Sequence, residues 1–291
     1  MLVSLNELLH NAQAGNYAVG AFNCPTLESV RAVIEAAEEL QVSVILSHAE
    51  VHNDLVPIEI IGPILVDFAK RASIPVAVHL DHGSNLDIVK TAIGLGFSSV
   101  MIDASHLNYE DNIKIVKEVV AYAQARKVSV EAELGVMTSS GLGGEDTERS
   151  EVVEVGDLYT DPLIAKDFVE RTGTDALAAS FGTVHGIYMT EPKLDFERLR
   201  AIHKNIKRPV VMHGGSGLSE ADYRSAINNG VRKINYYSYS ALAGAKAVKD
   251  FIEQNEKYFY HDITTVAKIA MKKDVKKAME IFQNNKINVH G

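Results

Sequence analysis

Short runs of hydrophobic residues alternate along the chain with longer segments that have helical periodicity. The runs are nearly continuous in apolar and β-branched side chains, which is typical of strands that are covered on both faces. They are Tyr17–Asn23, Val42–Ser47, Val76–Gly83, Ser98–Asp103, Val128–Glu133, Ala176–Phe181, Pro209–Met212 and Lys233–Tyr236. Between them lie amphipathic segments such as Thr26–Leu40, whose residues Val30, Val33 and Ile34 share one face and predict a helix.

The order of these elements predicts the fold. Strand–helix units follow one another without a linker rich in proline or glycine, over a length near the ~250 residues typical of a barrel enzyme. We therefore expect fold class α/β, with residues 1–291 forming a single (β/α)8 TIM-barrel domain. A doubly wound open sheet is the rival, but the residues after the first strand, Asn23-Cys-Pro-Thr26, lack its glycine-rich fingerprint.

Two segments stand apart from this alternation. Residues 135–157 are rich in glycine, serine, threonine and acids and have no periodicity, which is typical of a long loop that is either functional or disordered. The loop follows the fifth predicted strand, so we expect it beside the active site. After the last strand, helices are expected from about Ala241 and Thr264, and they form a C-terminal helical tail over residues 241–291.

Three histidines followed by glycine close, or follow closely, three of the predicted strands. These pairs are His82-Gly83, His185-Gly186 and His213-Gly214. Three neutral imidazoles on one rim of a barrel can hold a catalytic divalent metal with a coordination position left open. A lone histidine there would more often be a hydrogen-bonded, partly buried residue, but the repetition favours metal. Asp81 is then the candidate general acid/base, or else a carboxylate that orients a histidine.

Other polar residues gather at the same predicted rim. Asp103 and Glu133 end the fourth and fifth strands, where they could form an alternative metal position, orient other ligands or cap the following turns. The segments His213–Gly217 and Asn235–Ser238 follow the last two strands and contain small residues that expose backbone N–H groups. Barrels often bind phosphate in these two loops, so a phosphate site is predicted there.

Composition limits the classes of partner. The net charge of −9 argues against nucleic acid and anionic membranes as partners. The single cysteine, Cys24, cannot form an intrachain disulfide, and a reducing compartment is the default. No run approaches the ~20 apolar residues of a membrane span, and the first residues do not resemble a signal peptide. A cytoplasmic protein is expected.

Seven stretches of the sequence closely resemble the class II, metal-dependent ketose-bisphosphate aldolases, which cleave fructose or tagatose 1,6-bisphosphate. They are Ala21–Asn23, His79–Gly83, Val100–His106, Val130–Gly135, Ala179–Tyr188, His213–Gly217 and Lys233–Asn235. They run in order across about residues 17 to 240 and are together highly specific.

The resemblance assigns roles to individual residues. By this resemblance His82, His185 and His213 bind zinc, and Asp81 is the acid/base at the C4 hydroxyl of the substrate. Asp103 and Glu133 match a second or mobile metal site. Residues matched to substrate binding are Asn23, Gly186, Gly214, Ser216, Asn235 and Ser238. The acid in the loop that moves the proton at the nascent enolate carbon is Glu145, with Asp146 as the alternative.

The activity implied is reversible retro-aldol cleavage of a phosphorylated ketose to dihydroxyacetone phosphate and an aldehyde. The resemblance also implies Zn2+ as cofactor, with a second divalent or a monovalent cation as a further option. The expected partners are a small-molecule sugar phosphate and further copies of the chain, in a homodimer or homotetramer. Neither nucleic acid nor membrane is expected as a partner.

Two features depart from the family's pattern. Asn235 is followed by Tyr236, Tyr237 and Tyr239 where the family usually has acids or small residues. No arginine follows Arg232, although the family often uses a late arginine for the distal phosphate. The sugar epimer and the distal group of the substrate therefore stay open at this stage.

Two rival functions lack the residues that they need. A Schiff-base aldolase needs a lysine at the active end of a strand, and Lys233 is expected at the opposite end of the last strand. A non-catalytic barrel that serves as a scaffold or partner subunit needs neither Asp81 nor the three His-Gly pairs.

Overall fold

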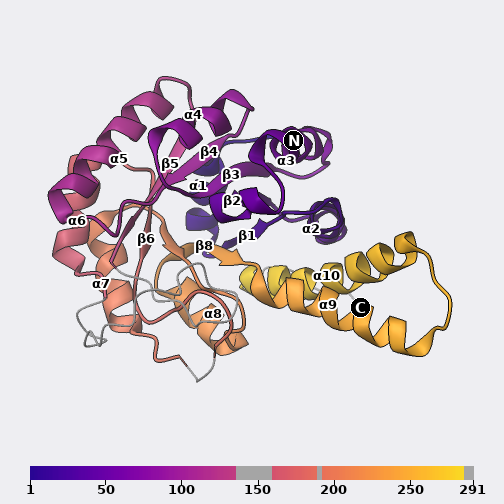
Figure 1. The fold of residues 1–291 in the computed structure, drawn as a ribbon. Helices are drawn as coiled ribbons and strands as arrows, with labels where there is room; N and C mark the ends of the chain where they lie inside the picture. The colour runs from indigo at the N-terminus through magenta and orange to yellow at the C-terminus, as the bar shows by residue number, and fades with distance from the viewer. Residues whose placement is uncertain (136–158, 189–191, 285–291) are drawn as a thin grey trace.

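The computed structural model of the chain describes residues 1–135, 159–188 and 192–284 (Figure 1). Apart from Gly135, the predicted loop of residues 135–157 lies outside these ranges, and so do its candidate acids Glu145 and Asp146. Among the described helices, none combines the length and the apolar character that crossing a membrane requires.

Parallel strands close into a barrel in the order in which they occur in the sequence, which confirms the predicted (β/α)8 fold. The strands are β1 (Val19–Asn23), β2 (Val44–Ala49), β3 (Val76–Gly83), β4 (Ser99–Ile102), β5 (Ser129–Leu134), β6 (Ala176–Ala179), β7 (Val210–Met212) and β8 (Val231–Tyr236). Each strand packs inward on the barrel interior and outward on helices, which explains why its sequence is nearly continuous in hydrophobic residues.

Strand β6 is shorter than the sequence predicted. The expected strand extended to Phe181, but the observed one ends at Ala179. At the next residue the Ser180 N–H donates to Thr160 Oγ1 at 2.8 Å, and the Thr160 N–H donates to the Ser180 carbonyl at 2.9 Å. The chain leaves the sheet because these bonds replace the ladder, so His185 lies in the connection after β6.

Helices cover the outside of the barrel, and one helix closes its N-terminal end. The helices are α1 (Leu5–Gly15), α2 (Leu27–Leu40), α3 (Ile58–Arg71), α4 (Leu86–Gly94), α5 (Tyr109–Gln124), α6 (Pro162–Thr172), α7 (Phe196–Ile206), α8 (Glu220–Asn228), α9 (Ser238–Gln254) and α10 (Tyr260–Phe282), with a 3₁₀ helix η1 (Glu50–Asp54) after β2. Leu5, Leu8 and Leu9 of α1 are buried against inward-facing strand residues such as Ile45 and Val211. The functional site must therefore lie at the opposite, carboxyl end of the strands.

The last two helices form an arm that projects from the barrel (Figure 1). They begin at Ser238 and Tyr260, earlier than the predicted starts at Ala241 and Thr264. Helix α9 follows β8 almost without a loop. The earlier start of α10 has a local cause, because the Phe259 N–H donates to Asp262 Oδ2 at 2.9 Å and caps the helix.

Helix α10 returns along the arm and packs on α2. Lys272 Nζ lies 2.5 Å from Glu39 Oε1, and Lys268 Nζ lies 2.8 Å from Glu35 Oε2. At its end, Phe282 is fully buried, with its ring centroid 5.0 Å from that of Tyr223. The C-terminal helix is thus held to the barrel by ion pairs and by an aromatic contact.

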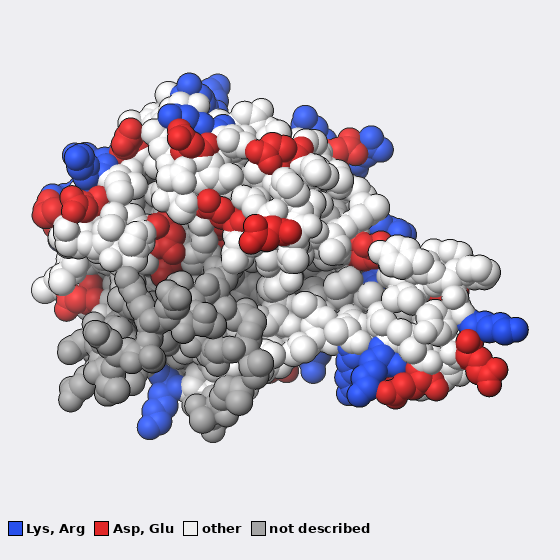
Figure 2. All heavy atoms as spheres, in the orientation of Figure 1, with Lys and Arg blue, Asp and Glu red and all other residues white. Residues whose placement is uncertain are grey.

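Acidic and basic side chains are interspersed over the face of the molecule seen in Figure 2. The drawn face carries no large basic field of the kind that attracts a polyanion.

Candidate active site at the carboxyl ends of the strands

Asp81 and His82 both face the carboxyl rim of the barrel because β3 is irregular at its end. Successive residues of a regular strand point to opposite faces. Here the pairing register of β3 with β4 shifts between Leu80 and Gly83, and His82 has φ of 49°. This left-handed conformation is unfavourable for a residue with a Cβ atom, and such strain is concentrated at functional sites.

The three histidines predicted from the His-Gly pairs come together. His82, His185 and His213 each offer a nitrogen, and these nitrogens all lie within 4.8 Å of one another. His213 Nε2 is 2.8 Å from Glu131 Oε1, and His82 Nδ1 is 2.9 Å from Asp103 Oδ2. The opposite ring atoms, His213 Nδ1 and His82 Nε2, lie 2.9 Å apart and face the centre of the cluster.

The remaining donor atom supports a metal site at this cluster. His185 Nε2 is buried and has no hydrogen-bond partner among the described residues. Burial and then the charge of His82 lower the pKa of His185 to about 3. This imidazole is therefore neutral, as a metal ligand must be. Burial also lowers the pKa of His213. Burial alone would lower the pKa of His82, but the charge of Asp81 and the hydrogen bond to Asp103 raise it well above its ordinary value, so a divalent cation bound by this donor set would displace one proton from His82.

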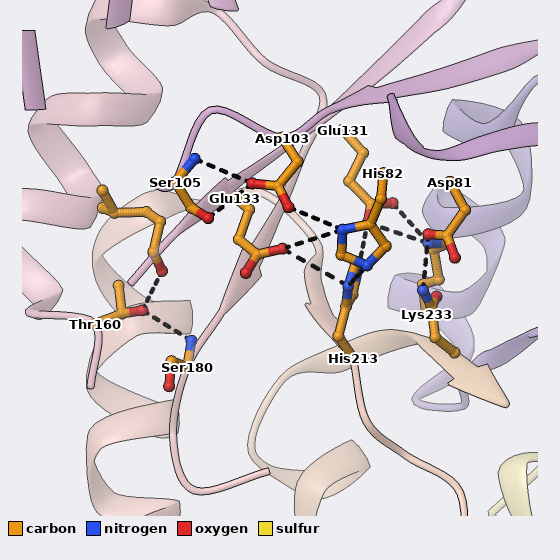
Figure 3. A network of polar contacts seen from close by, with 12 residues as sticks. Asp81, His82, Asp103, Ser105, Glu131, Glu133, Thr160, Ser180, His213 and Lys233 are labelled. Atoms are coloured by element: carbon orange, nitrogen blue, oxygen red, sulfur yellow. Dashed lines mark hydrogen bonds and ion pairs between the residues drawn. The ribbon is translucent and has the colours of Figure 1, made fainter. Parts of the chain in front are cut away.

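Two carboxylates surround His82 on the side away from Asp81 (Figure 3). His82, Asp103 and Glu133 form a second group with ligand atoms within 4.8 Å of one another. Burial alone would raise the pKa of Asp103, but hydrogen bonds from His82 and Ser105 hold it below its ordinary value. Burial and then the neighbouring Asp103 raise the pKa of Glu133 well above its ordinary value. Because His82 belongs to both groups, the two groups describe alternative positions for a metal ion beside this histidine.

The Asp81 carboxylate is oriented by two amides from strands that adjoin each other in the barrel. Asn23 Nδ2 on β1 donates to Oδ2 at 2.9 Å, and Asn235 Nδ2 on β8 donates to Oδ1 at 3.0 Å. Asp81 is only 2% exposed. Burial alone would raise its pKa, but the charges of His82 and Lys233 outweigh burial and hold the pKa well below the ordinary value. The geometry thus presents an ionised, fixed carboxylate beside the histidine cluster.

A cavity at this rim brings the predicted substrate-binding residues together. Its lining consists of Asn23, Asp81, His82, His185, Gly186, Gly214, Ser216, Asn235, Tyr236, Tyr237 and Ser238. Gly214 has φ of 61°, and a Cβ atom there would collide with the Val184 carbonyl, so only glycine fits. Helix α9 begins at Ser238, so the positive end of its dipole adjoins the cavity. These features are those of an anion-binding cradle.

Comparisons with known proteins agree with this geometry. The family described as "Fructose-bisphosphate aldolase class-II" matches residues 3–286. The chain belongs to this family. A fructose-bisphosphate aldolase of Staphylococcus aureus is 40% identical to this aldolase over 287 residues, which are 97% of each chain.

Two further relatives of this class II aldolase show how wide the family is. A 6-phospho-5-dehydro-2-deoxy-D-gluconate aldolase of Halalkalibacterium halodurans is 41% identical over 290 residues, 98% of this chain and 97% of the relative. The crystal structure of the YdjI aldolase from Escherichia coli K12 has a TM-score of 0.86 at 32% identity, with 99% of this chain and 100% of that chain covered. The protein is an aldehyde-lyase of the aldolase kind, as predicted, and metal dependence is general for its family.

Sequence reasoning missed an ion pair of the aldolase that lies inside the barrel. Glu131 on β5 and Lys233 on β8 are both fully buried, and Lys233 Nζ lies 2.8 Å from Glu131 Oε2. The sequence placed Lys233 at the start of the last strand, but β8 begins at Val231, so Lys233 lies within the strand and its ammonium group reaches Glu131 inside the barrel. One signal was available, because Glu131 and Glu133 alternate along a buried strand and must face the same side.

Sequence reasoning also missed His52 of η1, which packs against Tyr237, one of the residues that line the cavity. The His52 ring lies 4.8 Å from the Tyr237 ring, and its Nδ1 is buried with no hydrogen-bond partner in the described parts of the chain. Burial and then the neighbouring His48 lower the pKa of His52 to about 4, so it is neutral near pH 7. Glu50 fixes η1 by accepting the Ser84 N–H at 2.6 Å. No local pattern distinguishes His52 from an ordinary loop histidine.

Proposed function

We propose that this aldolase uses Zn2+ bound by His82, His185 and His213 to cleave a ketose 1-phosphate reversibly to dihydroxyacetone phosphate and an aldehyde. The observation that carries the proposal is the convergence of three histidines, each with one nitrogen left for a ligand, beside the ionised Asp81. Zinc accepts such nitrogen ligands in catalytic sites and leaves a position for substrate. When bound, it would supply Lewis-acid polarisation of the substrate carbonyl.

Asp81 is proposed as the base that removes the proton from the C4 hydroxyl of the ketose. A carboxylate offers about four lone-pair sites, and the two amide hydrogen bonds use only two of them. The carboxylate is thus held in place while keeping acceptor capacity for the substrate. As the proton leaves, the C3–C4 bond breaks and the aldehyde half is released.

Three further acids complete the proposal. Glu145, with Asp146 as the alternative, is proposed to return a proton to C3 of the dihydroxyacetone phosphate half. This assignment rests on the family resemblance, because both residues lie outside the described ranges. Asp103 and Glu133 are proposed as a second metal position, which their proximity to His82 supports.

The phosphate of the dihydroxyacetone half is proposed to bind where β6, β7 and β8 end. The residues assigned to this half are Gly186, Gly214, Ser216, Asn235 and Ser238, and they line the cavity together with Asn23, a further proposed substrate-binding residue. The N-terminus of α9 and the close backbone approach at Gly214 support an anion there.

The distal end of the substrate is proposed to be unphosphorylated. Phosphate is best matched by a guanidinium or an ammonium group, and no lysine or arginine lines the cavity in the described part of the chain. Tyr237, which lines the cavity and packs against His52, suits a hydroxylated carbon chain instead. Identity alone does not choose the substrate, because relatives named for different sugar phosphates are equally similar to this chain.

Assembly and location complete the proposal. We propose a homodimer or homotetramer in the cytoplasm. An oligomer is supported by the arm, where the side chains of Phe259 and Tyr260 are 73% and 80% exposed. Aromatic groups that are so exposed are typical of surfaces that a partner covers.

The decisive experiment is cleavage of a panel of ketose phosphates by the purified enzyme, scored by release of dihydroxyacetone phosphate. Elemental analysis should find about one divalent metal per chain. A chelator should abolish cleavage, and zinc should restore it. Full activity in the metal-free enzyme would refute the proposal.

A further inference from the structure

A buried ion pair crosses the interior of the barrel. Lys233 Nζ on β8 lies 2.8 Å from Oε2 of Glu131 on β5 and donates to Oε1 at 3.1 Å. Both side chains are fully buried. A buried ion pair is usually no more stabilising than an apolar pair of similar volume, since both charges lose their hydration. Stability alone is therefore a poor explanation of why the barrel holds one.

The same glutamate contacts the histidine cluster (Figure 3). Glu131 Oε1 lies 2.8 Å from Nε2 of His213. An ionised carboxylate can only accept a hydrogen bond, so the proton of this imidazole must be on Nε2. Nδ1 is then left with a lone pair, and it is the atom that faces His82 at the centre of the cluster.

We propose that Glu131 and Lys233 act as a positioning pair for His213. Glu131 fixes the ring so that Nδ1 faces the metal, as carboxylates do for many metal-bound histidines. Lys233 contacts both oxygens of Glu131 and supplies the counter-charge that allows this carboxylate to stay ionised in a dry interior. The proposal rests on the function proposed above, in which His213 is a metal ligand.

The surroundings of Glu131 leave few other candidates for this task. The imidazole of His79 is the next polar group, and its Nε2 lies 3.6 Å from Glu131 Oε2, beyond hydrogen-bond distance. His79 Nδ1 is already bonded to Ser99 Oγ. Burial and then the charge of Lys233 lower the pKa of His79 to about 3, so it carries no charge that could replace the lysine.

The test compares two double variants that remove both charges at once. E131L/K233M keeps the volume but removes the acceptor for His213, whereas E131Q/K233M keeps an acceptor. The readout is the affinity of the metal-free protein for Zn2+, measured by competition with a chelator. We expect E131L/K233M to bind zinc about 10–100-fold more weakly than the parent, the usual effect of losing such a partner, and E131Q/K233M to lose much less.

Thr174→Val is the matched control. Thr174 is fully buried, and its Oγ1 donates to the carbonyls of Val130 and Ala176 without touching the histidines. This variant should unfold at a lower temperature yet bind zinc like the parent. If E131L/K233M behaves in the same way, the pair is merely structural and the proposal is overturned.

The role of Lys233 is tested by rescue. K233M alone leaves an uncompensated carboxylate in the interior, so it should melt at a much lower temperature than the E131Q/K233M variant. Equal melting temperatures would refute the counter-charge role.

The parent protein supplies a test that needs no variant. Ring nitrogens of ¹⁵N-labelled histidine should show His213 protonated at Nε2 in the zinc-loaded form, and protonation at Nδ1 would overturn the proposal.

The variant His213→Ala distinguishes failure of the metal site from failure of the positioning role. If His213→Ala binds zinc as tightly as the parent, it is the proposed metal site that fails. If His213→Ala loses zinc while E131L/K233M does not, only the positioning role fails.

Discussion

The D81N substitution is the sharpest test of the proposed chemistry. It nearly preserves the shape of the side chain but removes the group that accepts the proton from the substrate. Turnover should fall by roughly 10²–10⁴-fold, the usual contribution of a positioned general base. That loss corresponds to about 2.7–5.5 kcal/mol of transition-state stabilisation.

The structure also sets the expected effect of D81N on stability. Both carboxylate oxygens accept an amide N–H, from Asn23 and from Asn235, so the new amide must place its NH2 group against one of these donors. An unrelieved conflict of this kind costs about 1–3 kcal/mol. However, Oδ1 of Asn23 and Oδ1 of Asn235 are buried without partners in the described structure. If the side-chain amide of Asn23 or Asn235 rotates so that its NH2 group and its oxygen exchange places, the oxygen accepts a hydrogen bond from the new amide. The net loss of stability in D81N should therefore stay below about 1.5 kcal/mol.

The assay is kcat for dihydroxyacetone phosphate release at saturating ketose, with thermal unfolding and metal content measured on the same preparation. The matched control is D175N, at the N-terminal end of the barrel. Asp175 also accepts two hydrogen bonds, from Asn6 Nδ2 and from the Val130 N–H, both at 2.8 Å. D175N should lose similar stability but keep its turnover. If D81N turns over within tenfold of the parent, Asp81 is not the base.

Four further predictions follow from the site and the arm. Single alanine substitutions of His82, His185 or His213 should lower metal content and activity together. If a variant keeps its metal and its activity, the substituted histidine is not a metal ligand. Glu145→Ala should slow proton exchange at dihydroxyacetone phosphate more than it weakens substrate binding, and an unchanged exchange rate would move the role to Asp146. Fructose 1,6-bisphosphate should not be strongly preferred over a ketose 1-phosphate with an unphosphorylated end, and a preference of about a thousandfold in kcat/KM, roughly 4 kcal/mol, would reveal a distal phosphate site. Hydrogen bonds from Lys272 and then Lys276 lower the pKa of Glu39 from an ordinary 4.5 to about 2, so its contribution to stability is complete above pH 4.5 and disappears as the pH falls toward 2. Because Glu39 is largely exposed, E39Q should cost less than about 1 kcal/mol at pH 7, and a difference in melting temperature that persists at pH 2 would contradict this reasoning.

The sequence was sufficient to predict the barrel and the histidine cluster, because their signals are local. A buried strand is nearly continuous in hydrophobic residues, and a residue at its end faces the rim whatever the rest of the chain does. His82 and His213 could therefore be placed from their neighbours alone. His185 was expected shortly after a strand and lies there, but that strand ends two residues earlier than predicted, because the bonds that end β6 come from Thr160.

The contacts that were missed join distant parts of the sequence. Glu131 and Lys233 are 102 residues apart, and nothing near either residue indicates that they meet across the barrel. The left-handed backbone of His82 could not be predicted either, since glycine is the residue that normally marks this conformation. Sequence patterns predict the face of a strand or helix on which a side chain lies. The residue that it contacts depends on how the whole barrel closes.

The return of α10 along the arm has a consequence for synthesis of the protein. Its last residue, Phe282, accepts the Ala18 N–H at 3.0 Å immediately before β1, and the same helix packs on α2. The first strand and its helix are thus completed by residues that a ribosome adds only after all the strands of the barrel. Contacts that span so much of a chain form slowly, and they leave hydrophobic surface exposed until they do. The N-terminal units of a nascent chain should therefore depend on chaperones, and a chain that stops after α9 should be degraded rather than accumulate as a nearly complete enzyme.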